Sequence, residues 1–219
     1  QMFECENTSC RLRFPSDLST SRMEHCPVCG SPMRTTGKAY RNFHRPSTGF
    51  LLPDITLSLL LDNLRSAKNV GSIFRTANGA GVAHIFCCGT TPTPQHARVR
   101  KSSLGAETEV DWSYHPNSHD LAKKLLQENH HLVALESTID STSLLDDIHL
   151  DRQYKHIIMI LGNEISGIDP EVLLLANEVV HIPMAGAKTS LNVAVAAGIA
   201  LYQLIKTLGP PPHHGENSI

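Results

Sequence analysis

The chain has 219 residues, of which 41% are hydrophobic and 18% charged, and its formal net charge is −2. This composition is typical of a globular protein with one domain and a small appendage, and it excludes a disordered chain. No apolar run approaches the roughly 18–20 residues of a membrane helix, and no signal-peptide pattern opens the sequence, so we expect a cytoplasmic protein with no membrane partner.

Four of the six cysteines lie in the first 30 residues, in the pattern C-x4-C-x15-C-x2-C. Two close pairs at this separation are typical of a closed tetrahedral Zn²⁺ site, and a segment too short to bury a core needs such a staple. Disulfides would suit a secreted protein, and a redox C-x-x-C would open a helix in a βαβ unit. His25 and His44 are alternative ligands. The predicted structural zinc site consists of Cys5, Cys10, Cys26 and Cys29.

The segment after this zinc-ribbon-like module (residues 1–36) is interpreted as a basic linker, residues 37–53, because it is rich in proline, glycine and threonine. Residues 1–50 carry seven lysines and arginines against four acidic residues, whereas the rest of the chain carries 12 against 17. Arg41 and Arg45 are candidate RNA contacts among interleaved aromatic residues. A solvated surface explains the same charges equally well.

From residue 55, short apolar runs of strand length alternate with helical segments. Strands are predicted at residues 55–61, 84–89, 110–114, 131–136, 156–162 and 178–184. Helices are predicted at residues 69–81, 118–129, 169–176 and 190–207, with Ser118 as an N-cap, and residues 90–107 are predicted to form a polar loop. This alternation predicts an α/β domain with a mostly parallel sheet at residues 54–208, followed by a flexible tail at 209–219.

Unusual polar residues follow three of these strands, where ligands bind in parallel sheets. They lie at residues 63–69, 162–164 and 183–192. We therefore expect a single site built from three loops. The sequence lacks both the lysine of a phosphate-binding P-loop and the G-x-G-x-x-G pattern of dinucleotide-binding proteins.

Three segments, "NVGSIFRTANGAGV" (69–82), "IMILGNEISGI" (158–168) and "IPMAGAKTSLNVAVAAGIALY" (182–202), resemble in order and spacing the three motifs of the SpoU/TrmH family of SPOUT methyltransferases. The resemblance implies a Rossmann-like parallel sheet with a carboxyl-terminal deep trefoil knot. It also implies a homodimer with the last helix at its interface, S-adenosylmethionine as the cofactor and a ribose 2′-hydroxyl of tRNA or rRNA as the acceptor. The zinc module is not the usual appendage of this family.

The resemblance assigns Arg75 as the catalytic arginine. Because a guanidinium is a poor base, we expect it to orient the ribose or its phosphate and to stabilise the developing alkoxide. Asn69 is expected to position Arg75 or the acceptor, Glu164 to fix Arg75 by a charge-assisted bond, and Ser190 and Asn192 to complete the hydrogen-bond frame. The alternatives are that Asn69 and Ser190 only cap their helices and that Arg75 and Glu164 form a surface ion pair.

The resemblance also implies the residues that hold the cofactor. The predicted set consists of Leu161, Gly162, Asn163, Ile182, Met184, Gly186, Ser190 and Leu191. Gly71, Gly162 and Gly186 are expected to permit close approach of backbone or cofactor. Ile165 stands where the family usually has glycine, which predicts a narrower cofactor mouth.

Three basic residues of the predicted loop at 90–107 are candidate contacts to RNA phosphates, with a solvated loop as the alternative. These residues are Arg98, Arg100 and Lys101. The sequence thus predicts an RNA 2′-O-methyltransferase. The alternatives are a non-catalytic RNA- or ribosome-binding protein that keeps the fold, and a knotted methyltransferase that acts on a base.

Overall fold

The computed structural model describes residues 1–15, 24–37, 54–146 and 154–209. Contacts divide the chain into two compact units, Gln1–Ser47 and Thr48–Ile219, and the boundary falls within the predicted linker. Arg41, His44, Arg45 and the predicted tail beyond Gly209 lie outside the described residues. Within the described part, no helix is long and apolar enough to cross a membrane.

The amino-terminal unit contains a small antiparallel sheet in the order β2-β1-β3. Its strands are β1 (Met2–Cys5), β2 (Arg13–Pro15) and β3 (Met33–Gly37). Phe3 and Cys5 on β1 are buried, and the Phe3 ring stacks on Phe14 with the ring centroids 6.5 Å apart. A core this small buries too little apolar surface to stabilise a domain. We therefore expect this unit to need a further source of stability, such as a bound metal ion.

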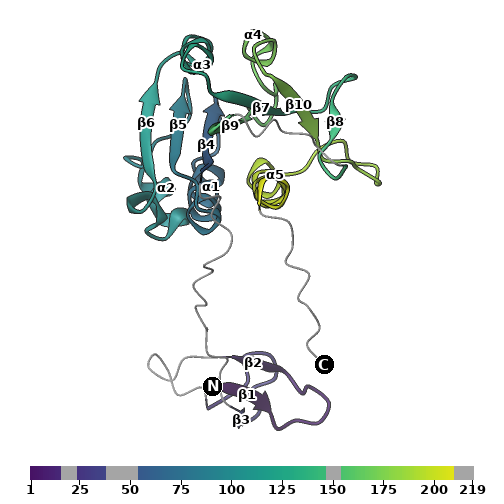
Figure 1. Ribbon diagram of the computed structural model, residues 1–219. Helices are drawn as coiled ribbons and strands as arrows, with labels where there is room; N and C mark the ends of the chain where they lie inside the picture. The colour runs from purple at the N-terminus through teal and green to yellow at the C-terminus, as the bar shows by residue number, and fades with distance from the viewer. Residues whose placement is uncertain (16–23, 38–53, 147–153, 210–219) are drawn as a thin grey trace, which may run out of the picture. The chain divides into compact units, whose positions relative to one another are not determined.

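The carboxyl-terminal unit contains a seven-stranded sheet in the order β6-β5-β4-β9-β7-β10-β8, and every pair of neighbouring strands is parallel (Figure 1). The strands are β4 (Thr56–Asp62), β5 (His84–Cys88), β6 (Asp111–His115), β7 (His131–Leu135), β8 (Thr142–Ser143), β9 (His156–Leu161) and β10 (Glu178–His181). The predicted α/β class with a parallel sheet is confirmed.

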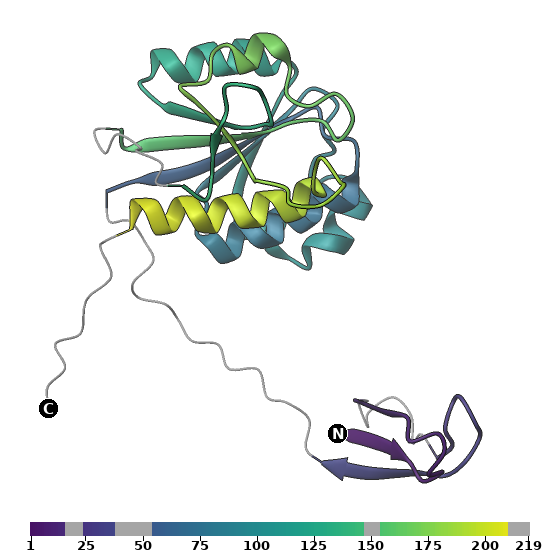
Figure 2. The same ribbon diagram turned by 90° about the vertical axis from the view of Figure 1, so that its right-hand side faces the viewer.

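Helices cover both faces of this sheet (Figures 1 and 2). They are α1 (Ala67–Ala80), α2 (Ala97–Ser103), the 3-10 helix η1 (Ala106–Thr108), α3 (Ser118–Gln127), α4 (Pro170–Leu173) and α5 (Val193–Leu208). Alternate residues of a strand point to opposite faces. Leu59 and Leu61 of β4 therefore pack with α1 and α5, whereas Leu60 packs with α3 and α4.

The predicted polar loop at residues 90–107 is wrong, because the structure places α2 and η1 there. The His96 side chain caps α2 by accepting a hydrogen bond from the backbone N–H of Arg98. Gly71 of α1 allows the two helices to touch, since a Cβ at this position would lie 2.0 Å from Ser102 Oγ and 2.4 Å from the Val99 carbonyl oxygen. This close packing, rather than local pattern, stabilises α2.

Other element boundaries also differ from the sequence-based expectation. α1 begins at Ala67, two residues before the predicted start, with Ser66 as its N-cap. α3 is capped by Asn117 instead of Ser118, and the short strand β8 was not predicted. α4 has four residues, half the predicted length. The trefoil knot stays a prediction.

Candidate active site

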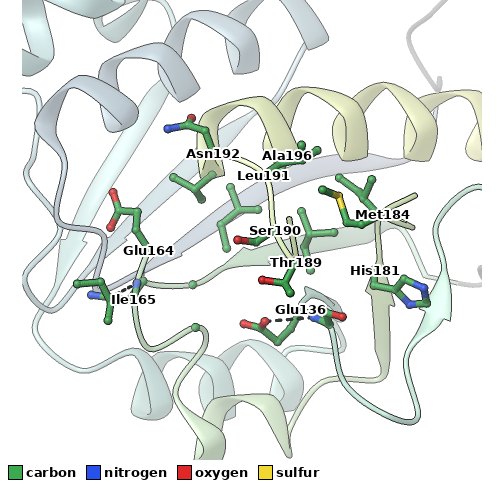
Figure 3. A pocket seen from close by; sticks show the side chains of 18 residues that line it. Glu136, Glu164, Ile165, His181, Met184, Thr189, Ser190, Leu191, Asn192 and Ala196 are labelled. Atoms are coloured by element: carbon green, nitrogen blue, oxygen red, sulfur yellow. Dashed lines mark hydrogen bonds between the residues drawn. The ribbon is translucent and has the colours of Figure 1, made fainter. Parts of the chain in front are cut away.

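A cavity of about 520 Å³ lies in the carboxyl-terminal unit, at the carboxyl ends of β7, β9 and β10 and beside the start of α5 (Figure 3). Small-molecule pockets usually occupy about 300–1,000 Å³. The walls come from four segments, residues 135–137, 161–167, 181–184 and 189–196. Two of the three predicted loops therefore form the walls, and the first, at residues 63–69, contributes through hydrogen bonds to Glu164.

Seven of the eight predicted cofactor residues line this cavity: Leu161, Gly162, Asn163, Ile182, Met184, Ser190 and Leu191. Gly186 does not line it, and no backbone of the described residues approaches it closely, because a Cβ on Gly186 would meet no heavy atom within 4 Å among them; its proposed role toward the cofactor stays a prediction. At Gly162 the expectation is confirmed, since a Cβ would lie 2.3 Å from the backbone nitrogen of Ile168.

Glu164 lies at the amino terminus of α1, although 95 residues separate it from Asn69 in the sequence. Its Oε2 accepts a hydrogen bond from the backbone N–H of Arg65 at 2.8 Å. Its Oε1 accepts from the backbone N–H of Ser66 at 3.1 Å and from Asn69 Nδ2 at 2.9 Å. A carboxylate at this end of a helix is also favoured by the helix dipole. Glu164 therefore attaches the loop after β9 to the start of α1.

The surroundings of Glu164 favour its ionised form. Partial burial raises the pKa of this carboxyl group. The hydrogen bonds from the backbone of Arg65 and the side chain of Asn69 lower the pKa by more than burial raises it, so the pKa lies below its usual value. At neutral pH the group is a hydrogen-bonded carboxylate with low proton affinity. This makes Glu164 an anchor rather than a proton acceptor.

Asn192 and Asn69 connect α5 to this anchor. Asn192 is the N-cap of α5, and its Oδ1 accepts a hydrogen bond from the backbone N–H of Ala194 at 3.0 Å. This bond leaves Nδ2 free to donate to Asn69 Oδ1 at 3.2 Å, which in turn directs Asn69 Nδ2 toward Glu164. The helix cap thus determines the orientation of both amides.

The alternative that Asn69 and Ser190 are only helix caps is wrong. Ser66 caps α1 and accepts a hydrogen bond from the backbone N–H of Asn69 at 3.3 Å, while Asn192 caps α5. Ser190 is exposed on the cavity wall, and its hydroxyl has no hydrogen-bond partner among the described residues. Its hydroxyl is therefore available to a ligand.

Arg75 is not bonded to Glu164, contrary to the expected charge-assisted bond and to the alternative of a surface ion pair. The carboxylate already accepts from the start of α1, whereas Arg75 lies six residues beyond Asn69, about 9 Å further along the helix axis. The Arg75 side chain is exposed and forms no hydrogen bond or ion pair within the part of the chain that the structure describes. Its guanidinium is free to bind a ligand.

The loop from Gly162 to Ile168 is ordered by hydrogen bonds within it and by one to Asn63. Asn163 Nδ2 donates to the carbonyl oxygen of Asn63 at 2.6 Å, and its Oδ1 accepts from the backbone N–H of Ile165 at 2.9 Å. The backbones of Asn163 and Gly167 exchange two further hydrogen bonds. Ile165 projects from this turn at the cavity edge and is 76% exposed, a position consistent with the predicted narrowing of the mouth.

Residues 56–202 match the family described as the SpoU rRNA Methylase family. The chain belongs to this family. Over 154 residues it is 31% identical to the tRNA (guanosine(18)-2′-O)-methyltransferase of Thermus thermophilus, an alignment that covers 69% of this chain and 74% of that protein. Over 161 residues it is 27% identical to the 23S rRNA (guanosine-2′-O-)-methyltransferase RlmB of Escherichia coli, covering 71% and 64% of the two proteins.

The fold is shared with solved SpoU structures. One is the SpoU methyltransferase AviRb from Streptomyces viridochromogenes in complex with AdoMet, which has 25% sequence identity and a TM-score of 0.61. The similarity covers 70% of this chain and 62% of that one. The segment that matches the SpoU family contains all the residues lining the cavity, and the four cysteines lie outside it.

Sequence reasoning missed part of the wall of this SpoU-family cavity. Glu136, directly after β7, and His181, the last residue of β10, both line it. The signal for Glu136 was an acidic residue at the end of the apolar run "HLVAL". The predicted strand at residues 131–136 includes Glu136, whereas β7 ends at Leu135 and leaves Glu136 at the carboxyl edge of the sheet.

The three basic residues of α2 differ in their surroundings. Arg100 Nη1 donates hydrogen bonds to the carbonyl oxygens of Pro94 at 3.0 Å and Gln95 at 2.6 Å. Arg98 and Lys101 are exposed, and neither side chain has a partner among the described residues. Arg100 therefore stabilises the turn before α2, whereas Arg98 and Lys101 are free to contact a polyanion.

In the amino-terminal unit, the four cysteine Sγ atoms all lie within 4.8 Å of one another. The closest pairs are Cys5–Cys29 at 3.4 Å and Cys10–Cys26 at 3.8 Å, and the structure contains no disulfide among them. Four thiolates that bind one Zn²⁺ at about 2.3 Å in a tetrahedron lie about 3.8 Å apart. The arrangement fits a closed four-cysteine metal site.

Proposed function

We propose that this SpoU-family chain transfers a methyl group from S-adenosylmethionine to a ribose 2′-hydroxyl in tRNA or rRNA. The observation that carries the proposal is the hydrogen-bonded group of Asn69, Glu164 and Asn192 beside a ligand-sized cavity. Asn69 belongs to α1, the helix that also bears Arg75, whose side chain has no partner among the described residues. The named activities of the Thermus and E. coli relatives support the same reaction. The proposal includes the trefoil knot that the resemblance implies.

The charges and shape of the cavity suit this cofactor. Two carboxylates, Glu136 and Glu164, line it, and no lysine or arginine of the described residues does. That balance favours a ligand with sulfonium and ammonium cations. The aliphatic side chains of Leu135, Leu161 and Ile182 offer an apolar wall for a purine ring. When bound, S-adenosylmethionine supplies an electrophilic methyl group.

The residues around the cavity mouth have different roles in methyl transfer. Methyl transfer to a hydroxyl is an in-line displacement, which depends on alignment of the acceptor. Arg75 orients the ribose or its phosphate and stabilises negative charge on the oxygen, and the hydroxyl proton is released to solvent water as the new bond to the methyl carbon forms and the bond from that carbon to sulfur breaks. Ser190 and Asn192 supply hydrogen-bonding groups beside the acceptor, and Asn69 and Glu164 hold Asn192 in place.

RNA binding is supported by an exposed basic surface on α1 and α2. Neither helix contains an acidic residue, and the two helices pack against each other at Gly71. The exposed basic side chains without a partner among the described residues are Arg65, Lys68, Arg75, Arg98 and Lys101. Such a surface suits the phosphate backbone of RNA. The proposed contacts also include Arg41 and Arg45, which lie outside the described residues.

A homodimer formed through α5 is supported by an apolar stripe on this helix. Val195, Ile199 and Tyr202 are 53%, 37% and 51% exposed, and their spacing of four and three residues places them on one helix face. Light scattering should give twice the chain mass. Val195→Glu should yield monomers, whereas Lys123→Glu, an exposed change on α3, should not; a monomeric wild type would refute the dimer.

The proposal also includes a structural Zn²⁺ bound by Cys5, Cys10, Cys26 and Cys29. The basic amino-terminal unit is proposed to bind RNA near the target nucleotide. Removing residues 1–45 should weaken RNA binding and leave cofactor binding intact. Unchanged RNA affinity of the truncated chain would refute this RNA-binding role.

Labelled methyl incorporation into total tRNA and total rRNA, assayed separately, tests the activity and names the substrate class. Nuclease digestion and mass spectrometry then place the methyl group on the ribose or on a base. A methylated base would establish the base-methyltransferase alternative. Calorimetry that finds no binding at millimolar S-adenosylmethionine would favour the non-catalytic RNA-binding alternative.

A further inference from the structure

Glu136 is a carboxylate in the cavity wall to which neither the sequence motifs nor the transfer chemistry assigns a role. It follows β7 directly and is half-buried. Figure 3 shows it on the opposite side of the cavity from Glu164 and Asn192. Glu136 is therefore separate from the hydrogen-bonded group of Asn69, Glu164 and Asn192.

The hydrogen bonds of Glu136 hold its carboxylate in position but do not saturate it. Oε1 accepts from the backbone N–H of Ser137 at 3.1 Å, and Oε2 accepts from the backbone N–H of Ile168 at 3.0 Å. No lysine, arginine or histidine of the described residues forms an ion pair with it within 4.0 Å. A carboxylate has about four lone-pair sites, so about two remain for a ligand.

The neighbours of Glu136 indicate which part of a ligand it meets. Leu135 precedes it and lies in register with Leu161 on β9, so aliphatic side chains form this side of the cavity. The amide group of Asn192 lies on the other side, beside the start of α5, where we place the acceptor (Figure 3). A purine nucleoside suits the apolar side, and Glu136 is the hydrogen-bond acceptor beside it.

We propose that Glu136 accepts hydrogen bonds from the 2′- and 3′-hydroxyl groups of the cofactor ribose and so selects a ribonucleoside over its 2′-deoxy analogue. The inference rests on the proposed cofactor. Two adjacent hydroxyls match the two open acceptor sites of a carboxylate, and hydrogen bonds to a charged acceptor are the stronger kind. A site built to bind a hydroxyl rejects the analogue that lacks it, because its acceptor is then left unpaired.

Calorimetry on the full chain tests this assignment with two probes, S-adenosylhomocysteine and 2′-deoxy-S-adenosylhomocysteine. Both are uncharged at sulfur, so a general loss of negative charge in the cavity affects them alike. Glu136→Gln keeps an oxygen that accepts from the Ile168 N–H and removes the charge. Glu178→Gln, on β10 but outside the cavity wall, is the matched control.

The wild type and Glu178→Gln should bind the ribose form at least about tenfold more tightly than the deoxy form, the effect of one hydrogen bond to a charged group. Glu136→Gln should weaken the ribose form about 10- to 100-fold and change the deoxy form much less. Equal weakening of both forms would mean that Glu136 only holds the loop at Ile168, and unchanged affinities would also overturn the assignment. If the wild type binds neither probe, the proposed cofactor itself is refuted.

Discussion

The Nδ2 atom of Asn192 lies 3.2 Å from Oδ1 of Asn69, although the two residues are 123 positions apart in the sequence. One amide therefore both begins α5 and holds a residue in the first turn of α1. A change in how α5 starts is transmitted to Asn69 and through it to Glu164.

Asn192→Asp separates these two roles. Aspartate is as good an N-cap as asparagine, so the free energy of unfolding should change by less than about 1 kcal/mol. It has no donor for Asn69 Oδ1 and adds a charge beside it, so methyl transfer should fall by about tenfold, the cost of one lost hydrogen bond. Denaturant unfolding and single-turnover transfer would be measured together. Full activity would show that the amide bond is dispensable.

Arg75→Ala should reduce methyl transfer by about 10²–10³-fold, the usual cost of losing one donor to a developing oxyanion. S-adenosylmethionine affinity should not change, because Arg75 does not line the cavity. Lys123→Ala, an exposed change on α3, serves as the control. Near-normal turnover of Arg75→Ala would remove this residue from the mechanism.

Glu164 should make stability depend on pH in acid. Because its pKa in the folded protein is lower than the unfolded value of about 4.3, its contribution is present above about pH 4.3 and is lost as the pH falls through the folded pKa. The effect should be small, because the side chain is largely exposed to solvent. Urea unfolding of wild type and Glu164→Gln should differ at neutral pH and converge in acid; a constant difference would contradict this role.

The salt dependence of RNA binding should distinguish Arg98 and Lys101 of α2, which are free to contact RNA, from Arg100, which stabilises the turn before the helix. Arg98→Ala and Lys101→Ala should each reduce the slope of log affinity against log salt for RNA by about one. Arg100→Ala should leave the slope unchanged and lower the melting temperature, because its guanidinium holds the carbonyl groups of Pro94 and Gln95. Equal slopes for all three variants would indicate an ordinary solvated surface.

Removal of metal should affect only the amino-terminal unit. Native mass spectrometry should find one Zn²⁺ per chain, and Cys26→Ser should lose it, while His25→Ala should retain it because only the four cysteines are clustered among the described residues. S-adenosylmethionine affinity should survive chelation, since the cavity is formed by the other unit. A zinc-free wild type would exclude the proposed site.

Six of the seven strands of the carboxyl-terminal unit could be located from sequence, because most contain a short apolar run bounded by polar residues, whereas β8 consists of two polar residues. α2 could not, because Val99 is its one buried apolar residue and its stability depends on contact with Gly71 of a different helix. In the site, the predicted partner of Glu164, Arg75, is wrong. The actual donors to Glu164 are the backbone N–H groups of Arg65 and Ser66 and the side chain of Asn69, which are more than 90 residues away in the sequence and meet Glu164 only in the folded chain.

The strand order of the sheet also determines when the cavity can form. Thr56 of β4 pairs with His156 of β9, 100 residues later, so the centre of the sheet closes only after most of the domain has been synthesised. Pairing across so long an interval is entropically costly and slow. β4, β5 and β6 can associate early on the ribosome, but the walls supplied by β9, β10 and α5 arrive last. Occupation of the cavity by a ligand would therefore report that folding of the domain is complete.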